Sequence, residues 1–102
     1  MAFKKTTQLN NGFSAEYWRI VNIEANKDAP FIEIRIVGYK DKATRQSGSK
    51  PVASKMFRLK TSDFDFSTDL FEQAYNLIKT AKEFKDTMNP DAVPFFADAV
   101  NG

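Results

Sequence analysis

The stretch FIEIRIVGY, residues 31–39, decides the fold class, because apolar and charged side chains alternate along it. Ile32, Ile34 and Ile36 share one face at a period of two, and Glu33 and Arg35 share the other. A strand with one apolar and one charged face is typical of an antiparallel sheet that packs a single face onto a core. The flanking sequence must therefore supply neighbouring strands and a cover for the isoleucine face.

Three other segments are predicted to be strands of the same sheet. Residues 15–24 are rich in aromatic and β-branched side chains, and residues 26–30 (NKDAP) supply a turn, so this segment forms an antiparallel hairpin with 31–39. Residues 52–59 form a third strand after a loop that contains Gly48 and Pro51. Residues 3–9 add an edge strand, followed by the turn signal Asn10-Asn11-Gly12.

Beyond Leu59 the apolar residues recur every three or four positions, which predicts an amphipathic helix over 69–85. Asp69 is placed to cap this helix, and Pro90 is placed to end it. We therefore expect a single α+β domain over 1–102: a small antiparallel sheet of three to four strands with one C-terminal amphipathic helix packed on one face. The side chains expected to face inward are Ile32, Ile34, Ile36, Phe57, Leu59, Leu70, Ala74, Leu77, Ile78 and Phe84.

The composition excludes several kinds of chemistry. The chain has no cysteine and no histidine, which excludes disulfides, thiolate nucleophiles, Ser-His-Asp catalysis and zinc sites built on imidazole or thiolate. Alternating oxygen side chains over 63–69 invite comparison with a calcium loop, but Thr68 and Ala74 stand where that loop needs glycine and glutamate. We expect no enzymatic activity, no cofactor and no metal, and we assign no catalytic residue.

Neither a signal peptide nor a membrane span is expected. The first residues carry Lys4 and Lys5, but no apolar run follows them. Nowhere does an apolar run approach the roughly 18 residues that a spanning helix needs. The sequence therefore predicts a soluble, unexported protein without a membrane partner.

Charge is segregated along the chain. Residues 40–60 hold seven basic side chains against Asp41 alone, whereas residues 61–102 hold eight acidic side chains against three lysines. Such a surface fits either a polyanion or the opposite end of another copy of the chain. One hypothesis is therefore a single-stranded nucleic-acid-binding protein that uses the basic hairpin over 40–60, although few aromatic residues accompany the charges. The candidate polyanion or partner-binding residues are Lys40, Lys42, Arg45, Lys50 and Arg58.

The last residues, 87–102, form an apolar tail. Burying a phenylalanine contributes roughly 1.5–3 kcal/mol, so we expect the tail either to pack on the body or to dock to a partner, as in a small assembly chaperone or host-directed regulator. A sheet face carrying Tyr17, Val21 and Phe31 opposite the helix would also be an oligomer contact. The candidate oligomer or docking contacts are Tyr17, Trp18, Val93, Phe95 and Phe96.

Several short motifs together resemble a family of small proteins encoded among the tail and tail-fibre genes of tailed bacteriophages and prophages. In chain order they are Asn11-Gly12, Tyr17-Trp18-Arg19-Ile20, Tyr39, Asp41-Lys42-Ala43 with Arg45, Gly48 with Lys50-Pro51, Asp65-Phe66, Ala74-Tyr75 and Ile78-Lys79. The family's Pro-Glu-Phe-Ala-Asp-Ala-type ending is matched at 94–100 and, more loosely, at 83–86. The resemblance implies a non-enzymatic structural or assembly protein of the tail. It also implies a homo-oligomer with other phage tail proteins as partners, located in the virion or the bacterial host cytoplasm.

Overall fold

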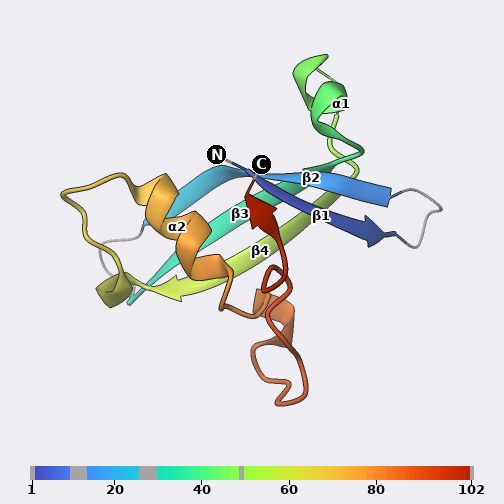
Figure 1. The fold of residues 1–102 in the computed structure, drawn as a ribbon. Helices are drawn as coiled ribbons and strands as arrows, with labels where there is room; N and C mark the ends of the chain where they lie inside the picture. The colour runs from blue at the N-terminus through green and yellow to red at the C-terminus, as the bar shows by residue number, and fades with distance from the viewer. Residues whose placement is uncertain (1, 10–13, 26–29, 49, 102) are drawn as a thin grey trace.

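Five antiparallel strands form one sheet in the computed structural model, which describes residues 2–9, 14–25, 30–48 and 50–101 (Figure 1). The strands lie in the order β4-β3-β2-β1-β5. They are β1 (Phe3–Gln8), β2 (Ser14–Ala25), β3 (Phe31–Tyr39), β4 (Ala53–Lys60) and β5 (Val100–Asn101). The helical elements are α1 (Lys42–Gln46), α2 (Leu70–Ile78) and the single turns η1 (Thr61–Asp63) and η2 (Phe84–Asp86).

The register of the central strands places the isoleucines of β3 at the middle of the core. Ile34 lies opposite Ile23 of β2 and Phe57 of β4, and Ile36 lies opposite Ile20. Ile32, Ile34 and Ile36 are fully buried, which confirms the face expected from their alternation. The strand expected over 3–9 is present as β1, paired with β2. The turns expected at 10–12 and 26–30 lie outside the described residues, except for Pro30.

The expected sheet of three to four strands with a C-terminal helix is wrong in two respects. The sheet has five strands, because Val100 and Asn101 pair with Lys4 and Phe3 of β1. A strand of two residues has too few positions to show a periodicity, so the sequence carried no signal for it. The helix is α2, which ends well before the C-terminus and leaves a long segment that returns to the sheet.

Helix α2 begins as expected and ends early. Asp69 caps it, since its carboxylate accepts the backbone N–H of Phe71 at 2.9 Å. At the other end, the backbone N–H and the hydroxyl of Thr80 both donate to the carbonyl of Leu77, at 3.2 and 3.1 Å. Such local bonds compete with the helical ladder. The helix expected over 69–85 therefore stops at Ile78, before the proline expected to end it.

A second helix, α1, lies in the β3–β4 connection, where the sequence indicated only a loop. The backbone N–H groups of Arg45 and Ser47 donate to the carbonyls of Asp41 and Ala43, at 3.2 and 3.0 Å. Gly48 follows with a φ of 84°, the left-handed conformation in which glycine commonly ends a helix. The basic hairpin tip therefore has a helical backbone.

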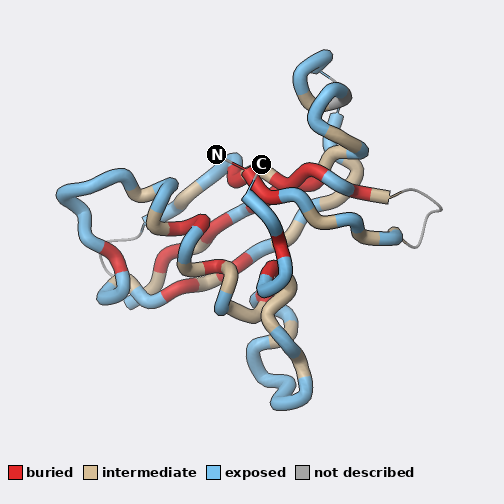
Figure 2. The backbone as a smooth tube through the Cα atoms, viewed as in Figure 1, coloured by how far each residue is buried: buried red, intermediate tan, exposed pale blue. Residues whose placement is uncertain are grey.

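The core lies between the isoleucine face and a cover made of α2 and the C-terminal segment (Figures 1 and 2). The hydroxyl of Tyr75 in α2 accepts the backbone N–H of Ile20 at 2.8 Å, next to an irregularity in the β2–β3 pairing. Gly38 gives Trp18 its space, because a Cβ there would lie 2.9 Å from Cζ3 of the indole. One expected inward residue is wrong: Phe84 is exposed to 40%, at the edge of the sheet.

Candidate functional site

The basic α1 connection and the η1 turn lie at opposite ends of the β3–β4 ladder. Its paired positions run from Phe31 with Lys60 to Gly38 with Ala53. The α1 connection follows one end of the ladder, and η1 with the loop to α2 follows the other (Figure 1). A strand rises about 3.3 Å per residue, so the seven steps from Phe31 to Gly38 span roughly 23 Å.

The basic tip is the α1 connection with four cationic side chains, which are Lys40, Lys42, Arg45 and Lys50. The three lysines are exposed and Arg45 is half-buried, and the α1 turn projects from the body of the molecule (Figures 1 and 2). An open hollow of about 410 Å³ lies at its base, lined by Lys4, Lys5, Thr6, Glu16, Tyr17, Asp41 and Lys42. The structure thus brings together four of the five basic candidates.

The fifth basic candidate, Arg58, lies elsewhere and has its charge compensated. It is on β4, and its Nη2 donates to Oε1 of Glu33 on β3 at 2.6 Å. The guanidinium also lies 4.2 Å from the ring centres of both Phe31 and Phe84. Arg58 therefore links η2 to the edge strand β4 through its contact with Phe84, and it lies away from the basic tip.

The acidic end consists of η1, the loop that follows and the first turn of α2, with four exposed carboxylates: Asp63, Asp65, Asp69 and Glu72. The loop is held in shape by its own side chains. Gln73 accepts the backbone N–H of Asp65 and donates to its carbonyl, both at 2.7 Å. Asp65 accepts the hydroxyl and the backbone N–H of Ser67, and these bonds lower the pKa of Asp65 below its ordinary value.

Two phenylalanines beside these carboxylates remain in solvent. Phe66 is exposed to 55% and Phe71 to 45%. Next to Phe71, a hollow of about 280 Å³ opens between β2 and α2, lined by Arg19, Ile20, Asp69, Phe71, Glu72 and Tyr75. The acidic end therefore combines negative charge with exposed aromatic surface, a combination that was not predicted from the sequence.

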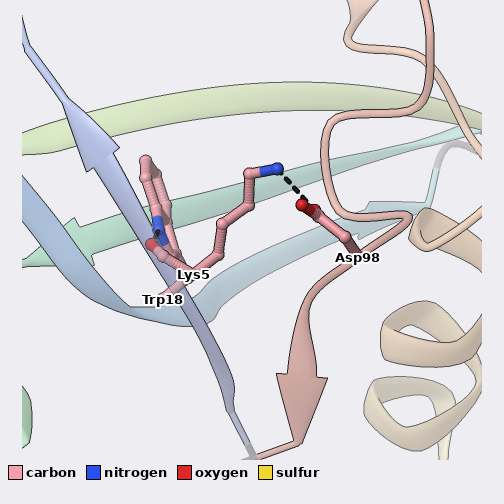
Figure 3. A network of polar contacts seen from close by, with 3 residues as sticks. All are labelled: Lys5, Trp18 and Asp98. Atoms are coloured by element: carbon pink, nitrogen blue, oxygen red, sulfur yellow. Dashed lines mark hydrogen bonds and ion pairs between the residues drawn. The ribbon is translucent and has the colours of Figure 1, made fainter.

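Two lysines of the sheet face inward and pair with the C-terminal segment. Nζ of Lys55 lies 3.0 Å from Oε1 of Glu83, and Nζ of Lys5 lies 2.5 Å from Oδ1 of Asp98 (Figure 3). The bond from Lys5 lowers the pKa of Asp98 below its ordinary value. Neither pair was predicted from the sequence, although Lys55 has the same strand parity as Phe57 and thus belongs to the core face.

Between these two lysines the C-terminal segment enters the core. The Phe95 ring lies 4.7 Å from Nζ of Lys5 and 4.2 Å from Nζ of Lys55. Phe96 is fully buried, with its ring centre 5.5 Å from that of Trp18 and 5.1 Å from that of Phe3. Residues 95 and 96 of the predicted tail are thus packed on the body.

Most candidate oligomer or docking contacts are consequently inaccessible to a partner. Trp18 and Phe96 are fully buried, Tyr17 is buried and Phe95 is half-buried, which leaves Val93 as the exposed member of the set at 77%. Trp18 is further fixed by its indole N–H, which donates to the carbonyl of Lys5 at 3.0 Å (Figure 3). Aromatic side chains that were candidates for contact instead form the core.

The sheet face opposite α2 does not present the apolar surface that Tyr17, Val21 and Phe31 were expected to form. Val21 is exposed to 46%, whereas Tyr17 is buried and Phe31 lies against Arg58. The same face of β3 carries Glu33 and Arg35, as the alternation predicted. Tyr17, Val21 and Phe31 therefore do not form one exposed apolar surface on this face.

Comparisons of the chain with protein-family models, with curated proteins and with solved structures give no match. Within the described residues, no group of carboxylates is arranged to hold a metal ion. The described helices include none that is long and apolar enough to cross a membrane. The resemblance to phage tail proteins therefore stays a prediction.

Proposed function

We propose that this chain is a non-enzymatic, tail-associated structural or assembly protein of a bacteriophage, which acts through protein–protein contacts and self-associates. The observation that supports contact as its function is the segregation of exposed charges into a basic tip and an acidic end, which lie on different elements of the fold. Separated charges of opposite sign steer partners into a defined orientation. The tail setting comes from the resemblance of the sequence motifs.

A single-stranded nucleic acid is the second candidate partner, and the basic tip is the observation that favours it. Four cationic side chains in the connection between β3 and β4, two of them on the projecting α1 turn, are able to contact phosphates. Single-strand binding also draws on aromatic rings that stack with bases, yet Trp18 and Phe57 are fully buried and Tyr39 is half-buried. We therefore favour a protein partner for the tip.

The third candidate, an assembly chaperone or host-directed regulator, relied on the C-terminal tail as a docking peptide. Two of the three expected docking residues of the tail are Phe95 and Phe96. Both of their rings pack against the Trp18 ring, and Phe95 also contacts the sheet lysines. Releasing them would open the core of the domain. Because of this cost, we do not propose the tail as a docking peptide. The proposed contacts are instead made by the charged side chains at the surface.

Static light scattering across protein concentration, at low and at high salt, tests the proposal. We expect the average mass to rise with concentration at low salt and to fall back towards the monomer at high salt, because exposed charges are screened. A mass that stays at the monomer value at every concentration and salt would refute self-association. A gel-shift titration with oligonucleotides runs beside it, and salt-sensitive binding there by a monomer would favour the nucleic-acid candidate.

A further inference from the structure

We propose that the basic tip of one copy docks on the acidic end of the next, beside the first turn of α2, so that copies associate head to tail. This inference rests on the self-association proposed above and names the two surfaces that meet. One surface presents cations on a projecting helix, and the other presents carboxylates beside an exposed ring.

The acceptor surface is the hollow between β2 and α2. Asp69 and Glu72 bring two carboxylates to its rim, whereas Arg19 brings one guanidinium, so its charge is negative on balance. The Asp69 carboxylate already accepts the N–H of Phe71, whereas the exposed side chain of Glu72 makes no hydrogen bond or ion pair within the described residues. The Phe71 ring, which is exposed to 45%, lines the same hollow. A cation there gains both a charge partner and an aromatic surface.

The donor surface is one side of α1. Lys42 and Arg45 are three residues apart on this helix, and side chains at that spacing share a face. The side chain of Lys42 is exposed and, like that of Glu72, has no hydrogen-bond or ion-pair partner within the described residues. The projecting position of α1 in Figure 1 lets it reach a neighbouring molecule without moving the sheet.

The molecule already contains an interaction of the proposed kind. The Arg58 guanidinium contacts the rings of Phe31 and Phe84 and donates to the Glu33 carboxylate. A cationic side chain at Phe71 and Glu72 would repeat this combination of ring and carboxylate between two copies. The guanidinium of Arg45 suits it best, because its planar group stacks on rings and bonds carboxylates in two places.

The positions of the two surfaces determine the type of assembly. They are different surfaces of the molecule, one on α1 and the other between β2 and α2, so the contact is heterologous, and a copy bound at one surface keeps its other surface free. Such contacts build a ring when the rotation closes and an open chain when it does not. A mass that stops at two copies is therefore not expected.

A charge-swap experiment tests the docking directly. The tip variant is Lys42→Glu with Arg45→Glu, and the acceptor variant is Glu72→Lys with Asn76→Lys, which places two exposed lysines on one face of α2 and keeps the Asp69 cap. We expect each variant alone to self-associate at least tenfold more weakly than the unmodified chain at low salt. An equimolar mixture should recover association, because reversed tips then meet reversed acceptors.

The matched control is Arg35→Glu with Lys85→Glu, which changes the net charge as the tip variant does, at exposed positions outside both surfaces. The control should associate like the unmodified chain, and thermal unfolding should show that all variants are folded. Association of the unmodified chain that neither swap weakens would overturn the head-to-tail contact and leave the proposed function standing. The head-to-tail contact is also overturned if both swaps weaken association but the mixture does not recover it.

Two other outcomes overturn the inference in different ways. An unmodified chain that is monomeric under every condition removes the proposed self-association together with the contact. A monomer whose salt-sensitive oligonucleotide binding is lost in the tip variant assigns the tip to nucleic acid instead.

Discussion

Truncating Phe96 to alanine separates a core role of the C-terminal segment from a docking role. Phe96 is fully buried, and its ring lies within 5.7 Å, centre to centre, of the rings of Phe3, Trp18, Phe57 and Phe95. Replacing a buried phenylalanine by alanine costs roughly 3–5 kcal/mol, the lost transfer energy plus the cavity left behind. A small domain has only about 5–15 kcal/mol of stability, so most of it could be lost.

Urea denaturation followed by the fluorescence of the single tryptophan measures the effect, because Trp18 is buried against Phe96 and becomes exposed on unfolding. In thermal unfolding, a loss of about 3 kcal/mol lowers the Tm by at least about 12 °C for a domain of this size.

If Phe96→Ala does not fold, Phe96→Leu keeps most of the volume and should give a smaller, measurable loss. The control Val93→Ala, at an exposed position, should change stability by less than about 0.5 kcal/mol. A loss below about 1 kcal/mol for Phe96→Ala would refute the packing of this ring in the core.

Three further predictions concern single contacts. Gly38→Ala should cost about 1–3 kcal/mol in thermal unfolding, because the new Cβ would lie 2.9 Å from the Trp18 ring, and an unchanged Tm would contradict this close approach. Tyr75→Phe should cost about 1–3 kcal/mol and speed hydrogen exchange at Ile20, since it leaves that buried N–H without its acceptor, so unchanged exchange would argue against the bond. The Lys5 bond lowers the pKa of Asp98 below its ordinary value of 3.8. At a pH above 3.8 the ionised carboxylate therefore stabilises the fold, and this stabilisation is lost as the pH falls through the lower pKa of the folded state. Urea denaturation at pH 6 and pH 3 should then show a smaller pH dependence for Asp98→Asn, and an identical dependence would count against the pair.

The central sheet could be predicted because its information is local. Ile32, Ile34 and Ile36 alternate with Glu33 and Arg35. Successive side chains of a strand point to opposite faces, so this alternation places the isoleucines towards the core and the charged residues towards water. The start of α2 was predictable for a similar reason, since Asp69 satisfies an N–H in the turn that follows it. Such features depend on neighbours within a few residues.

The end of α2 and the existence of β5 could not be predicted from local pattern. The apolar period continues to Phe84, but the helix ends at Ile78, where Thr80 bonds the Leu77 carbonyl, and Glu83 and Phe84 contact Lys55 and Arg58 on β4 instead. β5 forms where Phe96 is buried and the following residues are brought alongside β1. The β4 contacts of Glu83 and Phe84 and the pairing of β5 both join distant segments of the chain.

The candidate site divides in the same way. The sequence by itself determined that the chain has a basic and an acidic region, that it has no cysteine or histidine chemistry, and that it has a sheet with one charged face. Only the tertiary structure decided which charges remain available, because Lys5 pairs with Asp98 across 93 residues of sequence, while Lys42 and Glu72 are left in solvent. The physical reason is that the alternation along a strand determines which face of the sheet each side chain lies on. Whether a charged side chain finds a partner depends on the distant segment that folding brings against that face.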